Sequence, residues 1–482
     1  MTKGIITIFF TITLGLTLYS QDNIQNSIVK IFTTKQANDL NEPWNSGRIQ
    51  RSTATGFIIE GNRIITNAHA VANYRYLQVR FGNNPRKIDV KIEFISDDYD
   101  LAILKFTDNS ELPKLKPLEF GNSLKLKEKV VVYGYPIGGD RLSITEGIIS
   151  RIQLRKYVFS QKTYSTIQTD AATNPGNSGG PVFVGNKVIG IHFQGTRNAN
   201  NIGHTIPSHI IQHFLDDIKD NKYDGIPSLE LKWTPLESNI HRKMLGMKDN
   251  ETGVLVKSVN KYSNIKKIIE KNDVILKLDN ELLGIDGSIN FNEGERIGFN
   301  YLLEHKKYGD YIEIELLRNK KKLTKRIKLE KPNRNPVIVS YKSKSIPSYY
   351  ITSGFVFQKL SINYLNQFTK SRRNLKDKPY DLINFIKNPP DNIDEIIFLT
   401  SVLPDVSNEG YQHLKNIAIA EVNNEKVVNM RDFISKINKE RYATLKDING
   451  NIIVIDNNIS KERNPKIKEI YNISSLQSKD LD

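Results

Sequence analysis

Short apolar runs broken by Gly, Asn and Asp dominate the chain from Gln21 to about Gly225. Such runs are typical of β-strands joined by tight turns, and their succession predicts an all-β pair of barrels. The clearest strands are at residues 28–32, 55–59, 77–81 and 130–133. From Ile206 to Ile218 the apolar positions instead follow a helical period, which predicts a helix that closes this domain.

Two further regions follow the first. The region after Pro227 contains two apolar runs that predict strands, Thr252–Val256 and Asn272–Asp279. The last region contains three apolar runs that predict a sheet, together with a helical segment at Asn429–Ile434. The chain has 482 residues, and length alone favours about three domains. We therefore expect a mainly β fold with domains at residues 21–225, 226–334 and 335–482.

Residues 1–20 combine Lys3, an apolar stretch from Ile5 to Leu18 and the small residue Ser20. This is the pattern of a secretory signal peptide. It predicts an exported protein, periplasmic or extracellular in a bacterial envelope, with no stable membrane span once the leader is cleaved. Retention of the leader as an anchor is the alternative, although the apolar run is shorter than the ~20 residues that span a bilayer.

Composition narrows the classes of function. The chain has no cysteine, which excludes disulfides, thiol chemistry and thiolate metal sites. Its net charge is +16, which favours contact with anionic surfaces. No zinc-finger, RNA-recognition or helix-turn-helix signature accompanies the lysines, so we do not expect specific binding of nucleic acid. We expect neither a cofactor nor a metal.

The chemistry is concentrated in the glycine-rich stretch Asn174–Pro181, which contains Ser178. Glycine tolerates positive φ and allows close approach of the backbone, so the N–H groups of Gly176 and Ser178 can both point at one oxyanion. A serine becomes a nucleophile only when a histidine takes its proton and a carboxylate orients that histidine. His69 ends one apolar run and Asp100 begins another.

Each of these residues has a purely structural alternative when it is taken alone. The stretch around Ser178 could be a flexible turn, His69 a buried core histidine, and Asp100 a turn residue before a strand. Their order along the chain favours catalysis, because His69, Asp100 and Ser178 follow one another as in the chymotrypsin-type double β-barrel. Subtilisin-like and α/β-hydrolase enzymes use other orders. The sequence therefore predicts a serine protease with a His-Asp-Ser triad.

With these motifs the chain resembles the HtrA/Deg serine proteases, and most closely the Deg branch known from plants. The matching segments are residues 66–69, 100–104, 168–172, 174–181 and 206–208. The resemblance implies a chymotrypsin-like double barrel followed by two PDZ-like α+β domains. It also implies ATP-independent cleavage of unfolded or damaged proteins. A chaperone-like holdase that binds unfolded chains with little proteolysis is the alternative.

The resemblance also assigns residues around the nucleophile. It implies that the walls of the S1 pocket are formed by Ala172, Thr173, His192, Phe193, Gln194 and His204. None of these is acidic, so we do not expect cleavage after Lys or Arg, and small or medium aliphatic residues are the better expectation. His192 and His204 are more polar than the family's usual residues there.

Two expectations concern binding and assembly. By resemblance, the loop of Met244, Leu245, Gly246 and Met247 captures a peptide carboxylate, the alternative being that Met and Leu only pack the core. Relatives build homo-oligomers from trimers through the N-terminal segment of the protease. This makes Phe32 and Trp44 the candidates for the contact, unless Trp44 covers its own barrel.

Overall fold

The computed structural model describes residues 24–482 except 83, 111, 113, 114, 123, 173, 196–201, 333–336, 370–377 and 391. The expected signal peptide lies outside the described residues. The chain divides into two compact units, one of residues 1–34 and 51–334 and one of residues 35–50 and 335–482.

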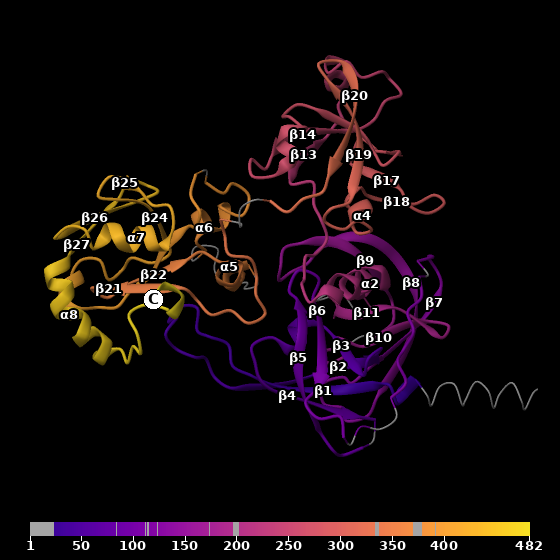
Figure 1. Ribbon diagram of the computed structural model, residues 1–482, viewed down its shortest axis with the longest axis horizontal. Helices are drawn as coiled ribbons and strands as arrows, with labels where there is room; N and C mark the ends of the chain where they lie inside the picture. The colour runs from indigo at the N-terminus through magenta and orange to yellow at the C-terminus, as the bar shows by residue number, and fades with distance from the viewer. Residues whose placement is uncertain are drawn as a thin grey trace, which may run out of the picture. The chain divides into compact units, whose positions relative to one another are not determined.

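Two closed six-stranded barrels form the first half of unit 1 (Figure 1), which confirms the predicted double barrel. The first barrel has the strand order β1-β2-β3-β6-β5-β4. Its strands are β1 (Ile28–Lys35), β2 (Gln50–Ile59), β3 (Arg63–Thr66), β4 (Tyr74–Phe81), β5 (Ile88–Ser96) and β6 (Leu101–Phe106). The second barrel has the order β10-β11-β12-β9-β8-β7. Its strands are β7 (Lys129–Gly134), β8 (Ser143–Lys156), β9 (Thr163–Thr169), β10 (Pro181–Val184), β11 (Lys187–Gly195) and β12 (Gly203–Pro207).

The predicted closing helix is α2 (Ser208–Asp217), which starts two residues later than expected because Ile206 and Pro207 end strand β12. Its apolar stripe is buried as predicted: Ile210 and Ile211 have no exposed surface and Phe214 is 2% exposed. Burial of side chains of this size stabilises the fold by about 1.5–3 kcal/mol each. The helix is therefore fixed against the second barrel.

A six-stranded antiparallel sheet completes unit 1. Its strands are β13 (Leu231–Pro235), β14 (Val254–Val259), β15 (Val274–Leu278), β16 (Glu281–Leu282), β19 (Tyr311–Arg318) and β20 (Lys321–Lys328). A small hairpin, β17 (Ser288–Asn290) with β18 (Arg296–Gly298), and the short helices α3 (Asn239–Met244) and α4 (Asn300–Leu303) accompany it. The turn before β15 uses Asn272 at φ 72°, a left-handed conformation that asparagine tolerates better than most residues.

Unit 2 contains a seven-stranded sheet in the order β21-β22-β23-β24-β26-β27, with β25 paired to β24. Its strands are β21 (Tyr349–Thr352), β22 (Phe355–Lys359), β23 (Ile397–Val402), β24 (Ile417–Val422), β25 (Glu425–Lys426), β26 (Tyr442–Asp447) and β27 (Ile452–Asp456). The helices are α5 (Ile362–Thr369), α6 (Tyr380–Asn384), α7 (Met430–Ile437) and α8 (Asn457–Ile470). The predicted helix at Asn429–Ile434 corresponds to α7, with Asn429 as its N-cap.

Residues 35–50 belong to unit 2, although they lie between the first two strands of the first barrel in sequence. The Nε2 atom of Gln358 donates to the carbonyl of Leu40 at 2.9 Å, and the ring of Trp44 meets that of Tyr349 edge-on at 6.5 Å. Trp44 therefore packs on the C-terminal sheet, and not on its own barrel as the alternative had it. The trimer contact assigned to this segment stays a prediction.

Candidate active site

His69 and Asp100 are held together by two neighbouring strands of the first barrel. His69 lies in a single 3₁₀ turn after β3, and Asp100 immediately precedes β6, which pairs with β3. Asp100 is 1% exposed and has φ 58°, so its backbone adopts a rare conformation. Its Oδ2 atom lies 2.7 Å from Nδ1 of His69, and its Oδ1 accepts from the backbone N–H of His69 at 2.8 Å.

This pair fixes the orientation of the imidazole. Because Nδ1 of His69 faces a carboxylate, the proton sits on Nδ1 in the neutral ring and Nε2 is left as the acceptor. The side chain of His69 keeps 25% of its surface exposed, so Nε2 is reachable. The ring of Phe159 stacks on it at 6.0 Å, with an interplanar angle of 14°. Phe159 gave no signal in the sequence, because the loop between β8 and β9 has no recognisable motif.

Ser178 lies in the turn before β10, where glycines permit a fold that other residues would not. Gly176 has φ 105°, and a Cβ atom there would lie 2.4 Å from the carbonyl oxygen of Tyr135. Gly179 has φ 87°, and its Cβ would lie 2.0 Å from the carbonyl oxygen of Thr55. Both distances are far below van der Waals contact, so side chains at these positions would break the turn.

Thr55 on β2 ties this turn to the first barrel, a role that sequence reasoning missed. Its Oγ1 donates to the carbonyl of Gly176 at 2.8 Å and accepts from the backbone N–H of Tyr135 at 2.8 Å. Its own backbone N–H donates to the carbonyl of Ser178 at 2.9 Å. Thr55 is completely buried, so these bonds do not compete with water. The nucleophile turn and the barrel that carries His69 are therefore joined directly.

The hydroxyl of Ser178 donates to the carbonyl of Phe193 at 3.3 Å. In the described part of the chain, the backbone N–H groups of Gly176 and Ser178 have no hydrogen-bond acceptor. Two unoccupied N–H donors in the turn of the serine suit the oxyanion role predicted for them. His69 and Asp100 are thus in direct contact, and Gly176 and Ser178 share one turn; the catalytic triad itself stays a prediction.

The expected S1 residues fall into several environments. His192 and Phe193 lie on β11 and His204 on β12, and they are 2%, 4% and 1% exposed. Gln194 pairs with His204 across the two strands. Ala172 is exposed on the segment before Ser178, and Thr173 lies outside the described residues.

Two buried imidazoles give this region an unusual chemistry. Burial, with smaller contributions from the charges of His204 and His69, lowers the pKa of His192 to about 3. Burial and the nearby cation of Arg155 lower the pKa of His204 to about 4. Both rings are therefore neutral at neutral pH. Arg155 on β8 donates to Nε2 of His204. The sequence did not predict Arg155 beside His204, because nothing in the sequence of β8 connects this arginine with the nucleophile.

The loop of Met244, Leu245, Gly246 and Met247 differs from the expected carboxylate site. The backbone N–H groups of the last three residues donate to the carbonyls of His241, Lys243 and Arg242, respectively, which ends helix α3. Met247 is 5% exposed and Met244 is 66% exposed. In this conformation these three N–H groups are used within the turn, so they cannot also bind a carboxylate.

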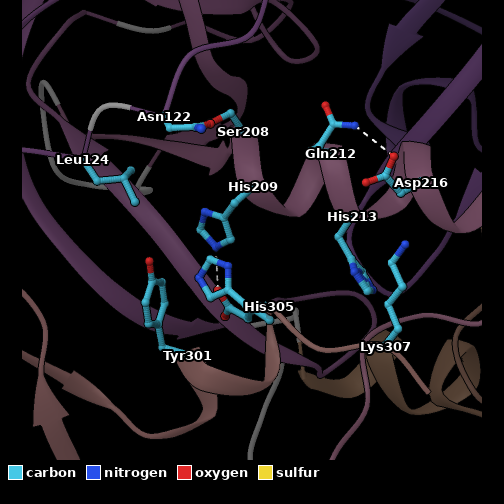
Figure 2. Close-up of a pocket in the computed structure, with 11 residues that line it drawn as sticks. Asn122, Leu124, Ser208, His209, Gln212, His213, Asp216, Tyr301, His305 and Lys307 are labelled. Carbon is cyan, nitrogen blue, oxygen red and sulfur yellow. Dashed lines mark hydrogen bonds and ion pairs between the residues drawn. The ribbon is translucent and has the colours of Figure 1, made fainter. Parts of the chain in front are cut away.

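A pocket of 380 Å³ lies between α2 and α4 (Figure 2), away from the triad. The carboxylate of Glu304 is 3% exposed and accepts from Ser165 N at 2.7 Å and Ser165 Oγ at 2.6 Å. His209 Nε2 lies 2.8 Å from the same carboxylate, and its ring stacks on that of His305 at 4.9 Å. Glu304 thus links the middle domain to β9 of the second barrel.

The described residues hold neither a metal-binding cluster nor a membrane-spanning helix. In that part of the chain, no group of three or more His, Cys, Asp or Glu side chains is arranged to hold a metal ion. The same residues contain no helix that is long and apolar enough to cross a membrane.

Comparison with known proteins places this site in a family. Residues 54–191 match the model of the trypsin-like peptidase domain, and residues 338–480 match that of the PDZ domain. The chain is 35% identical over 469 residues to Protease Do-like 4, mitochondrial, of Arabidopsis thaliana, covering 97% of this chain and 87% of the relative. This chain belongs to the Do-like (HtrA/Deg) proteases. It is a serine endopeptidase.

Other Do-like proteases agree with this assignment. Protease Do-like 2, chloroplastic, of Arabidopsis thaliana is 32% identical, covering 95% of this chain and 75% of the relative. A variant of the HtrA-type protease AlgW, solved with a decapeptide, matches at a TM-score of 0.52 and 21% identity. That match covers 66% of this chain and 99% of AlgW and shows the shared fold. The family and the mainly β fold with a C-terminal PDZ domain, as predicted from the sequence, are thereby confirmed.

Proposed function

We propose that this Do-like protease cleaves unfolded or damaged proteins without ATP, using His69, Asp100 and Ser178 as its triad. The observation that carries the proposal is the link from Asp100 Oδ2 to Nδ1 of His69, at 2.7 Å; the glycine-built turn of Ser178 supports it. Each residue has a neighbour that suits its role: a buried carboxylate for the imidazole, and two unoccupied N–H donors for the serine.

The chemistry follows from these positions. Before attack, the hydroxyl of Ser178 leaves the carbonyl of Phe193 and donates to Nε2 of His69. His69 takes the proton as Ser178 Oγ bonds to the substrate carbonyl carbon, and the N–H groups of Gly176 and Ser178 hold the resulting oxyanion. His69, now a cation stabilised by Asp100, gives the proton to the leaving amine. Water then repeats the sequence and releases the acyl group from Ser178.

The finer parts of the proposal concern substrate, assembly and location. The C-terminal PDZ domain supports a role in binding peptides or chains, because such domains add an extended segment to a sheet edge. We propose a homo-oligomer built from trimers, and a leader that takes the chain across a membrane. The Arabidopsis relatives are named as mitochondrial or chloroplastic. Their names favour a compartment behind a membrane, without favouring the bacterial envelope.

The test uses a denatured model protein, no nucleotide, and three forms of the full chain. Wild type should release fragments, Ser178→Ala should release none, and Ser110→Ala should behave as wild type because Ser110 is exposed and far from the turn in sequence. Equal fragmentation by wild type and Ser178→Ala would show that Ser178 is not the nucleophile.

One observation favours the alternative of a holdase: the Ser178 hydroxyl is bonded to Phe193 and not to His69. A serine that is not hydrogen-bonded to its general base is not activated in this conformation, which is compatible with binding without cleavage. Light scattering of an aggregating protein separates the two functions. If wild type and Ser178→Ala prevent aggregation equally and no fragments form, the holdase is the better description.

A further inference from the structure

The guanidinium of Arg155 has a neutral partner, His204, whose ring lies 6.3 Å from that of Phe193. Arg155 is half-buried on β8, and its Nη1 atom donates to Nε2 of His204. No carboxylate of the described residues forms an ion pair with it. A cation removed from water without an anion is unfavourable, and pairing with a hydrogen-bonded anion relieves this. The cation is therefore set up to receive a negative group.

His204 does not compensate this charge. Burial holds the pKa of His204 at about 4, so the ring is neutral at neutral pH. Its Nε2 atom accepts a hydrogen bond from the guanidinium. Its own proton is then on Nδ1. The neighbouring His192 is also neutral, and its Nδ1 is buried with no hydrogen-bond partner. The walls thus carry one positive charge and two neutral imidazoles.

A third polar group faces the same region. Tyr164 lies opposite Arg155 in the pairing of β8 with β9, and its hydroxyl is buried without a hydrogen-bond partner among the described residues. Burial raises the pKa of Tyr164 well above its usual value, so the hydroxyl keeps its proton and can donate. The ring of Tyr164 lies 6.5 Å from that of Phe193.

Contacts through Phe193 and His192 connect these groups with the turn of Ser178. The carbonyl of Phe193 accepts from the hydroxyl of Ser178, and the Phe193 ring lies 6.3 Å from that of His204. His192 precedes Phe193 on β11, and its carbonyl accepts from the N–H of Gly179, the residue after Ser178. The side chain before the scissile bond, P1, is the part of a substrate that reaches this place.

We propose that Arg155, together with His204, His192 and Tyr164, selects an acidic P1 side chain, Asp or Glu, in the S1 pocket. The inference rests on the proposed protease function and replaces the aliphatic preference expected from the sequence. A P1 carboxylate supplies the missing anion for Arg155 and accepts from the neutral donors around it. A P1 lysine or arginine meets a like charge and is excluded.

The experiment uses quenched-fluorescent peptides that differ only at P1: Glu, Gln, Ala and Lys. Glu and Gln have nearly the same shape, so their comparison isolates the charge. For wild type, kcat/KM should be at least about tenfold higher for Glu than for Gln, and Lys should be the poorest. Active enzyme is counted by labelling with a fluorophosphonate.

The variants assign the preference to Arg155. Arg155→Gln should reduce the Glu-to-Gln ratio of kcat/KM to about one, whatever its overall rate, and Arg155→Lys should keep part of the preference. Arg151→Gln is the matched control, because Arg151 lies on the same strand and is exposed. It should retain the full ratio.

The outcomes separate the two proposals. If wild type cleaves the peptides with equal kcat/KM for Glu and Gln, the acidic preference is wrong and the protease function stands. If wild type cleaves neither the peptides nor a denatured protein, the proposed function itself fails. If Arg155→Gln is inactive towards every peptide, the wild-type ratio and the Arg155→Lys variant still decide the inference.

Discussion

Thr55→Val removes the bonds that join the nucleophile turn to the first barrel while keeping the shape of the side chain. The threonine Oγ1 gives one hydrogen bond to the carbonyl of Gly176 and receives one from the N–H of Tyr135, both at 2.8 Å. Valine can make neither. Thr55 has no exposed surface, so water cannot replace the lost partners without opening the barrel.

The expected effect has two parts. A buried polar group that loses its partner costs about 1–3 kcal/mol, and two such groups are left, so the free energy of unfolding should fall by about 2–6 kcal/mol. The second part concerns catalysis, because the Gly176 carbonyl holds the turn that aims the oxyanion donors. A displacement of about 1 Å in such a site lowers the rate by about 100-fold. We expect kcat to fall by about 10–100-fold with little change in KM.

Scanning calorimetry and peptide kinetics measure the two parts separately. Thr53→Val is the control, because Thr53 lies on the same strand and is partly exposed. The free energy of unfolding of Thr55→Val could instead lie within about 0.5 kcal/mol of the wild-type value, with kcat unchanged. That result would show that the turn does not depend on these bonds.

Three further predictions follow from the same contacts. Asp100→Asn should lower kcat by about 10⁴-fold through loss of the correct His69 tautomer, and an activity close to wild type in peptide assays would contradict the role of Asp100. Because burial lowers the pKa of His192 to about 3 and of His204 to about 4, the unfolded chain takes up protons below pH ~6.5 that the folded chain does not. The free energy of unfolding should therefore decrease as the pH falls from 6.5 to 4, and this decrease should be smaller in His192→Asn. Urea denaturation at several pH values measures it, and an equal decrease in both proteins would refute the prediction. Glu304→Gln should loosen the middle domain from the second barrel, giving faster hydrogen exchange at β9, whereas the exposed Glu293→Gln should not.

The sequence predicted the parts of the fold that are encoded locally. Alternating apolar runs gave the strands of both barrels, and the stripe of Ile210, Ile211 and Phe214 gave helix α2. The signals for the proposed triad are local as well, because His69 and Asp100 each adjoin a strand and Ser178 lies in a glycine-rich turn. Such features depend on residues that are neighbours in the chain.

The contacts that sequence reasoning missed join distant segments. Thr55 lies 121 residues from Gly176, and Arg155 lies 49 residues from His204, so no local pattern connects them. Residues 35–50 looked like part of the first barrel because of their position, yet they pack in unit 2 through Trp44. The loop at Met247 matched a known motif, but its N–H groups are used to end helix α3.

The central claim is that Ser178 is an activated nucleophile, and covalent labelling tests it most directly. Folded wild type, Ser178→Ala and Asp100→Asn are treated with a fluorophosphonate, digested and mapped by mass spectrometry. We expect one adduct, on Ser178, in wild type and none in Ser178→Ala, with labelling greatly slowed in Asp100→Asn because His69 then lacks its oriented tautomer. Labelling of Ser178→Ala at wild-type speed, or an adduct on another serine, would contradict the assignment.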